Sequence, residues 1–188
     1  VSASSLRKAH AVHPIAAVQS EYSLWAREPE QEMLQTCAEL GTSFVAYSPL
    51  GRAFLTGTLD TMALASNDFR KILPRINGDA EVANRLLVEA LGRFAAARGA
   101  TNAQIALAWL LHKHPHVIPI PGTRRIAYLE QNAAATAIAL STADVAEQLG
   151  QQYPRVPGRL LPAAAVHSRR PGRDGRLLLR SRLRQCRG

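Results

Sequence analysis

The sequence of 188 residues contains only two cysteines, three lysines and no long hydrophobic run, and these shortages exclude several classes of protein. Cys37 and Cys186 do not make a disulfide framework, and their spacing is not that of a metal site. The apolar run IALAWLL, residues 105–111, is too short to cross a membrane, and no signal-peptide pattern follows Arg7 and Lys8. We therefore expect a cytoplasmic protein in a reducing compartment, with no membrane partner and no metal.

The charged residues are distributed unevenly along the chain. Residues 1–153 contain 13 basic and 13 acidic side chains, so the net charge of +9 comes from residues 154–188. This arginine-rich tail has ten arginines and one acid, Asp174, and its mixture of Arg, Pro, Gly and Leu is typical of disorder. Ten arginines could bind nucleic acid or another polyanion, although no nucleic-acid-binding motif accompanies them. Anion binding through the tail is therefore an alternative function, and nucleic acid is not the partner that we expect.

Short apolar runs alternate with amphipathic stretches in residues 1–153, which we interpret as one domain. The runs predict buried strands at residues 15–20, 43–48 and 117–120. The amphipathic stretches predict helices at residues 28–41, 80–99, 101–114, 126–136 and 141–149, with a short helix near 68–73. Such alternation indicates an α/β fold in which helical crossovers join parallel strands.

Several expected helices carry start and stop signals. Thr101 and Gln104 have the spacing of a capping box, and Pro29 suits the first turn of a helix. Gly41 and Gly99 suit the position just after a helix.

A polar cluster stands at the end of each expected strand: QSEY at 19–22, YSPLGR at 47–52 and GTRR at 122–125. In a parallel α/β sheet the carboxyl ends of the strands meet on one side, where binding sites form. A helix start with Thr and Arg attracts a phosphate, and an amide and a tyrosine ring suit an aromatic ligand. Each cluster also has a purely structural interpretation, as a strand end, a half-buried tyrosine or a helix cap with two solvated arginines.

The stretches AVQSEYSLWAREPEQEML, VAYSPLGRAFLTGTL and IPIPGTRRIAYLEQN resemble the C-terminal half of the aldo-keto reductases, in the bacterial and plant branch. The resemblance covers residues 1–153. It implies the C-terminal half of a (β/α)8 TIM barrel, with parallel strands and an incomplete barrel. It also implies an NADP-dependent oxidoreductase that reduces aldehydes or ketones and binds NADP(H) at the C-terminal face of the barrel.

The resemblance implies cofactor-binding roles for ten residues. Gln19 would bind the nicotinamide carboxamide, and Tyr47 would stack on the nicotinamide ring. Ser48, Leu50 and Arg52 would line the loop that binds the pyrophosphate. Gly122, Thr123 and Arg124 would bind the 2′-phosphate. Gln131 and Asn132 would reach the adenine end of the cofactor. Two positions depart from the family pattern: Tyr128 often has a basic counterpart, and Ala53 replaces a common glycine.

The catalytic tetrad of the family, Asp, Tyr, Lys and His, comes from the first half of the barrel, before the point that matches Val1. We therefore identify no catalytic residue here and expect this chain alone to be inactive. Three strands would leave a sheet edge open, so we expect the fold to need a missing N-terminal half or a partner. A non-catalytic fragment is the remaining alternative.

Overall fold

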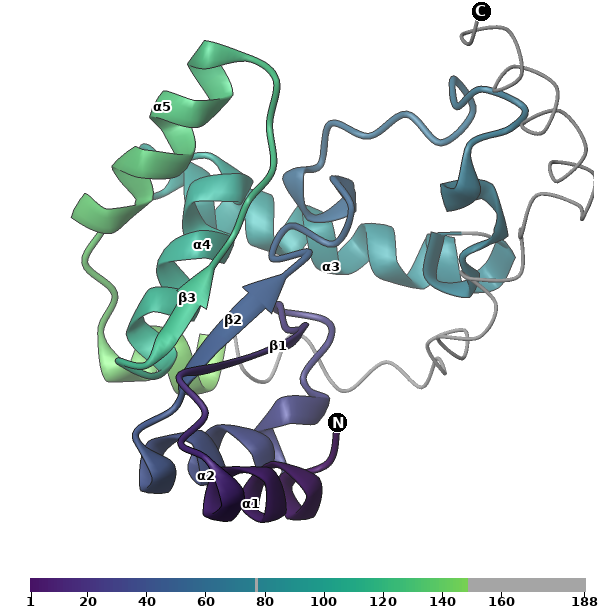
Figure 1. Ribbon diagram of the computed structural model, residues 1–188. Coiled ribbons are helices and arrows are strands. Elements are labelled where there is room, and N and C mark those ends of the chain that lie inside the picture. Colours follow the sequence, from purple (N-terminus) through teal and green to yellow (C-terminus); the bar gives the residue numbers. More distant parts are fainter. Residues whose placement is uncertain (77, 149–188) are drawn as a thin grey trace, which may run out of the picture. The chain divides into compact units, whose positions relative to one another are not determined.

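A computed structural model describes residues 1–76 and 78–148, and it contains a parallel three-stranded sheet in the order β1-β2-β3 (Figure 1). The strands are β1 (Ala17–Glu21), β2 (Ser43–Tyr47) and β3 (Val117–Pro119). Their register aligns Gln19 with Val45 and Val45 with Ile118. The three predicted strands are confirmed, with ends shifted by one or two residues. The arginine-rich tail and the predicted domain boundary lie outside the described residues.

The described part of the chain also contains five α-helices: α1 (Ala3–Val12), α2 (Met33–Leu40), α3 (Gly78–Ala96), α4 (Asn102–Lys113) and α5 (Ile126–Ala134). The predicted capping box is present on α4, where Thr101 Oγ1 accepts from the Gln104 N–H and Gln104 Oε1 accepts from the Thr101 N–H. Gly41 and Gly99 end α2 and α3 with left-handed φ values of 65° and 61°, as predicted. None of the helices in the described part of the chain is long and apolar enough to span a membrane.

Three elements differ from the predictions. The predicted helix at 28–41 is divided into a 3-10 turn, Glu28–Glu30, and α2, because Glu32 between them has non-helical backbone angles. Helix α1 was not predicted; its signal is Ser2, whose side chain accepts the Ser5 N–H. The predicted helix after Ser141 has two α-helical residues, Thr142 and Ala143, and continues as a π-helical turn, Asp144–Gln148.

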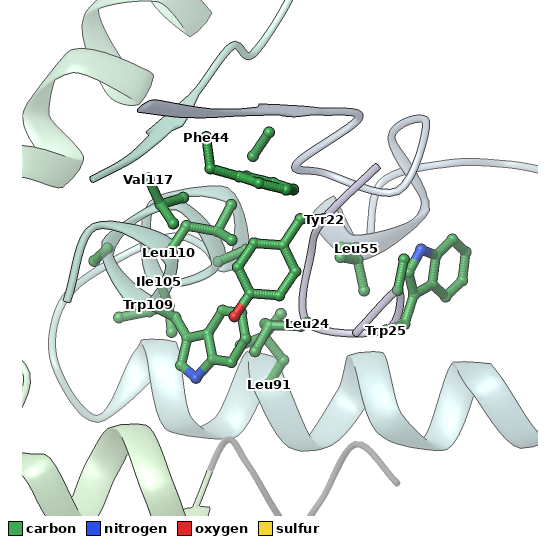
Figure 2. Packing of buried hydrophobic residues seen from close by; sticks show 14 of the residues in the cluster. Tyr22, Leu24, Trp25, Phe44, Leu55, Leu91, Ile105, Trp109, Leu110 and Val117 are labelled. Atoms are coloured by element: carbon green, nitrogen blue, oxygen red, sulfur yellow. The ribbon is translucent and has the colours of Figure 1, made fainter. Parts of the chain in front are cut away.

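The core lies between one face of the sheet and α4 (Figure 2). Six consecutive residues of α4, from Ile105 to Leu110, are buried. Tyr22, just after β1, meets Phe44 of β2 edge-on at 5.9 Å and the Trp109 ring at 5.6 Å. These aromatic contacts fix the end of β1 against the helical layer.

The other face of the sheet is much less covered. Gln19, Ile118 and Ile120 are exposed, and α5 has no buried residue. In the described part of the chain, β1 and β3 each pair with β2 alone. The predicted open sheet edges are therefore present in the described fold.

Candidate functional site

The carboxyl ends of the three strands lie at one end of the sheet because the strands are parallel. β1 ends at Glu21, β2 at Tyr47 and β3 at Pro119. The segments that follow β2 and β3 contribute residues to one cavity. Two of the three polar clusters in the sequence therefore contribute directly to a common site.

The loop after β2, residues 48–53, has an unusual backbone. Ser48, Arg52 and Ala53 have φ values of 50°, 55° and 76°, and Gly51 has a φ of 55°. A non-glycine residue in this left-handed region costs roughly 1–3 kcal/mol. Gly51 lies directly against Trp25, since a Cβ placed on it would be 2.7 Å from the indole. The surroundings therefore hold this loop in a strained conformation, a common feature of ligand-binding segments.

A cavity of about 900 Å³ lies beside this loop. Its walls come from residues 48–58, the segment 67–70, the start of α4, residues 120–123 and α5. This volume is in the range of small-molecule sites, roughly 300–1,000 Å³. The cavity is large enough for a ligand that extends from β2 to α5.

Seven of the ten predicted cofactor-binding residues line this cavity. They come from the loop after β2, the loop after β3 and the middle of α5: Ser48, Leu50, Arg52, Gly122, Thr123, Gln131 and Asn132. The fold thus brings together residues that are more than 80 positions apart in the sequence.

Gln19, Tyr47 and Arg124 lie outside the set of described residues that line the cavity. Gln19 is exposed on the open face of the sheet, and Tyr47 is half-buried at the end of β2. Arg124 is exposed in the loop before α5, next to Thr123. Their predicted roles depend on a ligand that reaches beyond the cavity wall.

The sequence predicted no site residue in the segment 67–70, which forms part of the cavity wall. Asp68 Oδ1 accepts the Arg70 backbone N–H at 2.9 Å, and its two carboxylate oxygens accept from the Arg70 guanidinium. These bonds lower the pKa of Asp68 to about 2. Phe69, with 56% of its surface exposed, lies between them and lines the cavity. The available signal was the length of the loop after β2, since long loops in compact domains are often functional.

The start of α5 suits an anion. Thr123 Oγ1 accepts the Arg125 N–H at 3.2 Å, and no side chain in the described part of the chain caps the first N–H groups of α5. Uncapped N–H groups and the helix dipole attract negative charge. Arg125 turns toward Tyr128, with its Nη1 3.3 Å from the hydroxyl and its guanidinium 5.3 Å from the ring centroid.

Glu21 and Arg52 set the electrostatics near the strand ends. Arg52 Nη1 donates to Glu21 Oε1 at 3.3 Å. Burial raises the pKa of Glu21, although Arg52 and Arg75 partly oppose the rise. Burial and then the Glu21 carboxylate raise the pKa of Tyr47, so its ring stays neutral at physiological pH.

The sequence matches a model of the aldo/keto reductase family over residues 1–148, most of the chain. The chain belongs to the aldo/keto reductase family. Among curated members of the family it is similar to probable aldo-keto reductase 1 of Glycine max, with 43% identity over 146 residues. That alignment covers 78% of this chain and 42% of the relative.

Three solved structures share the fold of this chain over the parts that match. A thermostable aldo-keto reductase, Tm1743, in complex with the inhibitor epalrestat matches with 31% identity and a TM-score of 0.57, over 78% of this chain and 44% of that one. An aldo-keto reductase of Klebsiella pneumoniae in complex with NADPH matches with 28% identity and a TM-score of 0.58, over 85% and 48%. The glycerol dehydrogenase AKR11B4 of Gluconobacter oxydans, 22% identical with a TM-score of 0.68 over 81% and 48%, supports the fold alone.

The chain spans less than half the length of each of these relatives. Its parallel strands and covering helices fit part of the family's α/β barrel, as predicted from the sequence.

Proposed function

We propose that this chain carries the NADP(H)-binding part of an NADPH-dependent aldo-keto reductase that reduces aldehydes or ketones. When bound, the cofactor supplies a hydride. The observation that supports this proposal is the convergence of the loop after β2, the loop after β3 and α5 on one cavity. Family membership and an NADPH complex among the similar structures add support.

The chemistry of the cavity wall fits the parts of such a cofactor. Arg52 and the hydroxyl of Ser48 suit the pyrophosphate, and Thr123 with the uncapped start of α5 suits the 2′-phosphate. Farther along the wall, the amides of Gln131 and Asn132 suit the adenine end. The proposed phosphate-binding groups thus belong to the loops after β2 and β3 and the start of α5, and the proposed base-binding amides belong to the middle of α5.

Three residues outside the cavity wall complete the proposed site. Gln19 would donate to or accept from the carboxamide, and the neutral Tyr47 ring would pack against the nicotinamide. Arg124, exposed beside Thr123, would add a cation to the 2′-phosphate.

NADPH and NADH titrations followed by tryptophan fluorescence test the cofactor assignment. NADPH should bind more tightly than NADH. Arg124→Ala and Thr123→Val should each weaken NADPH binding by about tenfold, as for loss of a charged hydrogen bond, with little effect on NADH. Arg93→Ala, which removes an exposed charge from α3, is the matched control. Equal affinity for both cofactors, unchanged in Arg124→Ala, would contradict the proposed phosphate seat.

We also propose that this chain alone does not reduce carbonyls. Among the described residues that line the cavity there is no lysine and no histidine. Carbonyl reduction needs a positioned proton donor, which the family takes from the tetrad in the first half of its barrel. A chain that binds NADPH should therefore not oxidise it when an aromatic aldehyde is added. Steady NADPH oxidation would show that these 188 residues suffice.

A further inference from the structure

Glu21, the last residue of β1, has a buried carboxylate to which the proposed function assigns no role. Only 3% of its surface is exposed, and its Oε1 accepts a hydrogen bond from Arg52 Nη1. Among the described residues, none provides a hydrogen bond to the buried Oε2. Burying a carboxylate is energetically unfavourable without a nearby cation. The Arg52 guanidinium therefore offsets the cost of burying Glu21.

Arg52 connects this carboxylate to the cavity. It lies in the left-handed loop after β2, and its guanidinium is 5.9 Å from the centroid of the Phe69 ring. Arg52 and Phe69 both line the cavity, on segments that are far apart in the loop. A chain of contacts therefore runs from β1 through Arg52 to the wall formed by residues 67–70.

We propose that Glu21 is a positioning residue, which holds Arg52 and thereby the loop 48–53 and the Phe69 wall in the arrangement that binds the cofactor phosphates. This inference rests on the proposed NADP(H) site. Because Glu21 is buried, it acts through Arg52 and not by touching the cofactor. The negative charge of Glu21 is needed, since a neutral side chain would not hold the Arg52 guanidinium as strongly.

The first test compares Glu21→Gln with Glu28→Gln in the full chain. Glu28 is the matched control because its Oε1 is also 3.3 Å from an arginine, Arg75, while its side chain is 53% exposed. Glu21→Gln should weaken NADPH binding by about tenfold, and Glu28→Gln should leave it within about twofold. Equal affinity of wild type and Glu21→Gln would overturn the inference.

The second test needs no ligand. Hydrogen exchange of the amides in residues 48–56 should be faster in Glu21→Gln than in wild type, with exchange in α3 unchanged. If Glu21→Gln does not fold, Glu21→Asp replaces it; this variant keeps the charge, shortens its reach to Arg52 and should loosen the same amides. Unchanged exchange in a folded variant would overturn the role of Glu21. Failure of wild type to bind NADPH would overturn the proposed function, while the exchange result would still decide whether Glu21 holds the loop.

A pH profile separates positioning from a merely structural role. Burial raises the pKa of Glu21 against the opposing effects of Arg52 and Arg75, with Glu28 adding to the rise and Tyr47 lying beside it at the end of β2. As the pH is lowered, the affinity of wild type for NADPH should therefore begin to fall at a pH above the ordinary pKa range of a glutamate. Glu21→Gln should lack this loss of affinity. Parallel plots of affinity against pH for the two proteins would overturn the inference.

Discussion

Single residues in the loop after β2 decide how its backbone reaches the cavity. Gly51 needs the absence of a side chain for two reasons, its left-handed φ and the indole of Trp25. Ala53 adopts a φ of 76°, which explains why a glycine is common at this position in the family. The sequence alone indicated a turn here, but it could not reveal the contact with Trp25, which is 26 positions away.

Replacing Gly51 by alanine should therefore be more costly than the same change at a glycine with open space. Gly99→Ala is the matched control, because Gly99 has a φ of 61° and a Cβ added to it would meet nothing within 4 Å. Left-handed strain should cost Gly99→Ala about 1 kcal/mol, and the clash with Trp25 should cost Gly51→Ala about 1–3 kcal/mol more. Urea unfolding measures both values. Equal losses would mean that Trp25 moves aside freely.

The residues of the candidate site were partly predictable from the sequence. Thr123 and Arg52 lie in motifs where a strand ends, so their convergence followed from parallel topology alone. Phe69 lies in a loop without such a motif, and its contact with Arg52 depends on side-chain packing that no local pattern encodes.

The buried side chain of Tyr22 (Figure 2) joins several elements, because its hydroxyl donates to Glu30 Oε1 at 2.8 Å. Glu30 also accepts from Arg27 and lies 3.8 Å from Lys113 at the end of α4. This cluster ties the segment after β1 to the helix that covers the sheet. Glu30 ends the 3-10 turn Glu28–Glu30, so these contacts hold that turn against the segment after β1 and the end of α4.

Glu30 should make stability sensitive to acid. Burial raises its pKa, but the hydrogen bonds from Arg27 and Tyr22 with the charge of Lys113 outweigh burial and hold the pKa below the ordinary value of 4.5. A carboxylate with a depressed folded pKa stabilises the fold fully above its unfolded pKa, and this contribution disappears as the pH falls through the folded value. In Glu30→Gln the loss of stability just below pH 4.5 should be smaller than in wild type. Denaturant unfolding at several pH values measures it.

Glu89→Gln, at an exposed site of α3, provides the control for the change from acid to amide. It should keep the acid response of wild type. A Glu30→Gln protein with the same acid response as wild type would show that other carboxylates dominate this range.

At the scale of the whole molecule, the sheet has one covered face and one open face. Alternation along β3 places Val117 in the core, 4% exposed, and Ile118 on the open face, 49% exposed. The sequence pattern could not distinguish these two faces, because every residue of the run VIPI is apolar. Such runs are typical of strands that are buried on both faces of an α/β fold. The open face is therefore built like an interior surface, although the described chain leaves it exposed.

This asymmetry predicts unequal costs for two adjacent residues. Val117→Ala should destabilise the chain by about 2 kcal/mol, because it leaves a cavity between the sheet and α4. Ile118→Ala removes more atoms but should cost at most about 1 kcal/mol, since half of its side chain already contacts water. Urea unfolding and size-exclusion chromatography at the same protein concentration measure stability and association together. A larger loss at Ile118, in a protein that elutes as an oligomer, would mean that a second copy covers the open face in solution.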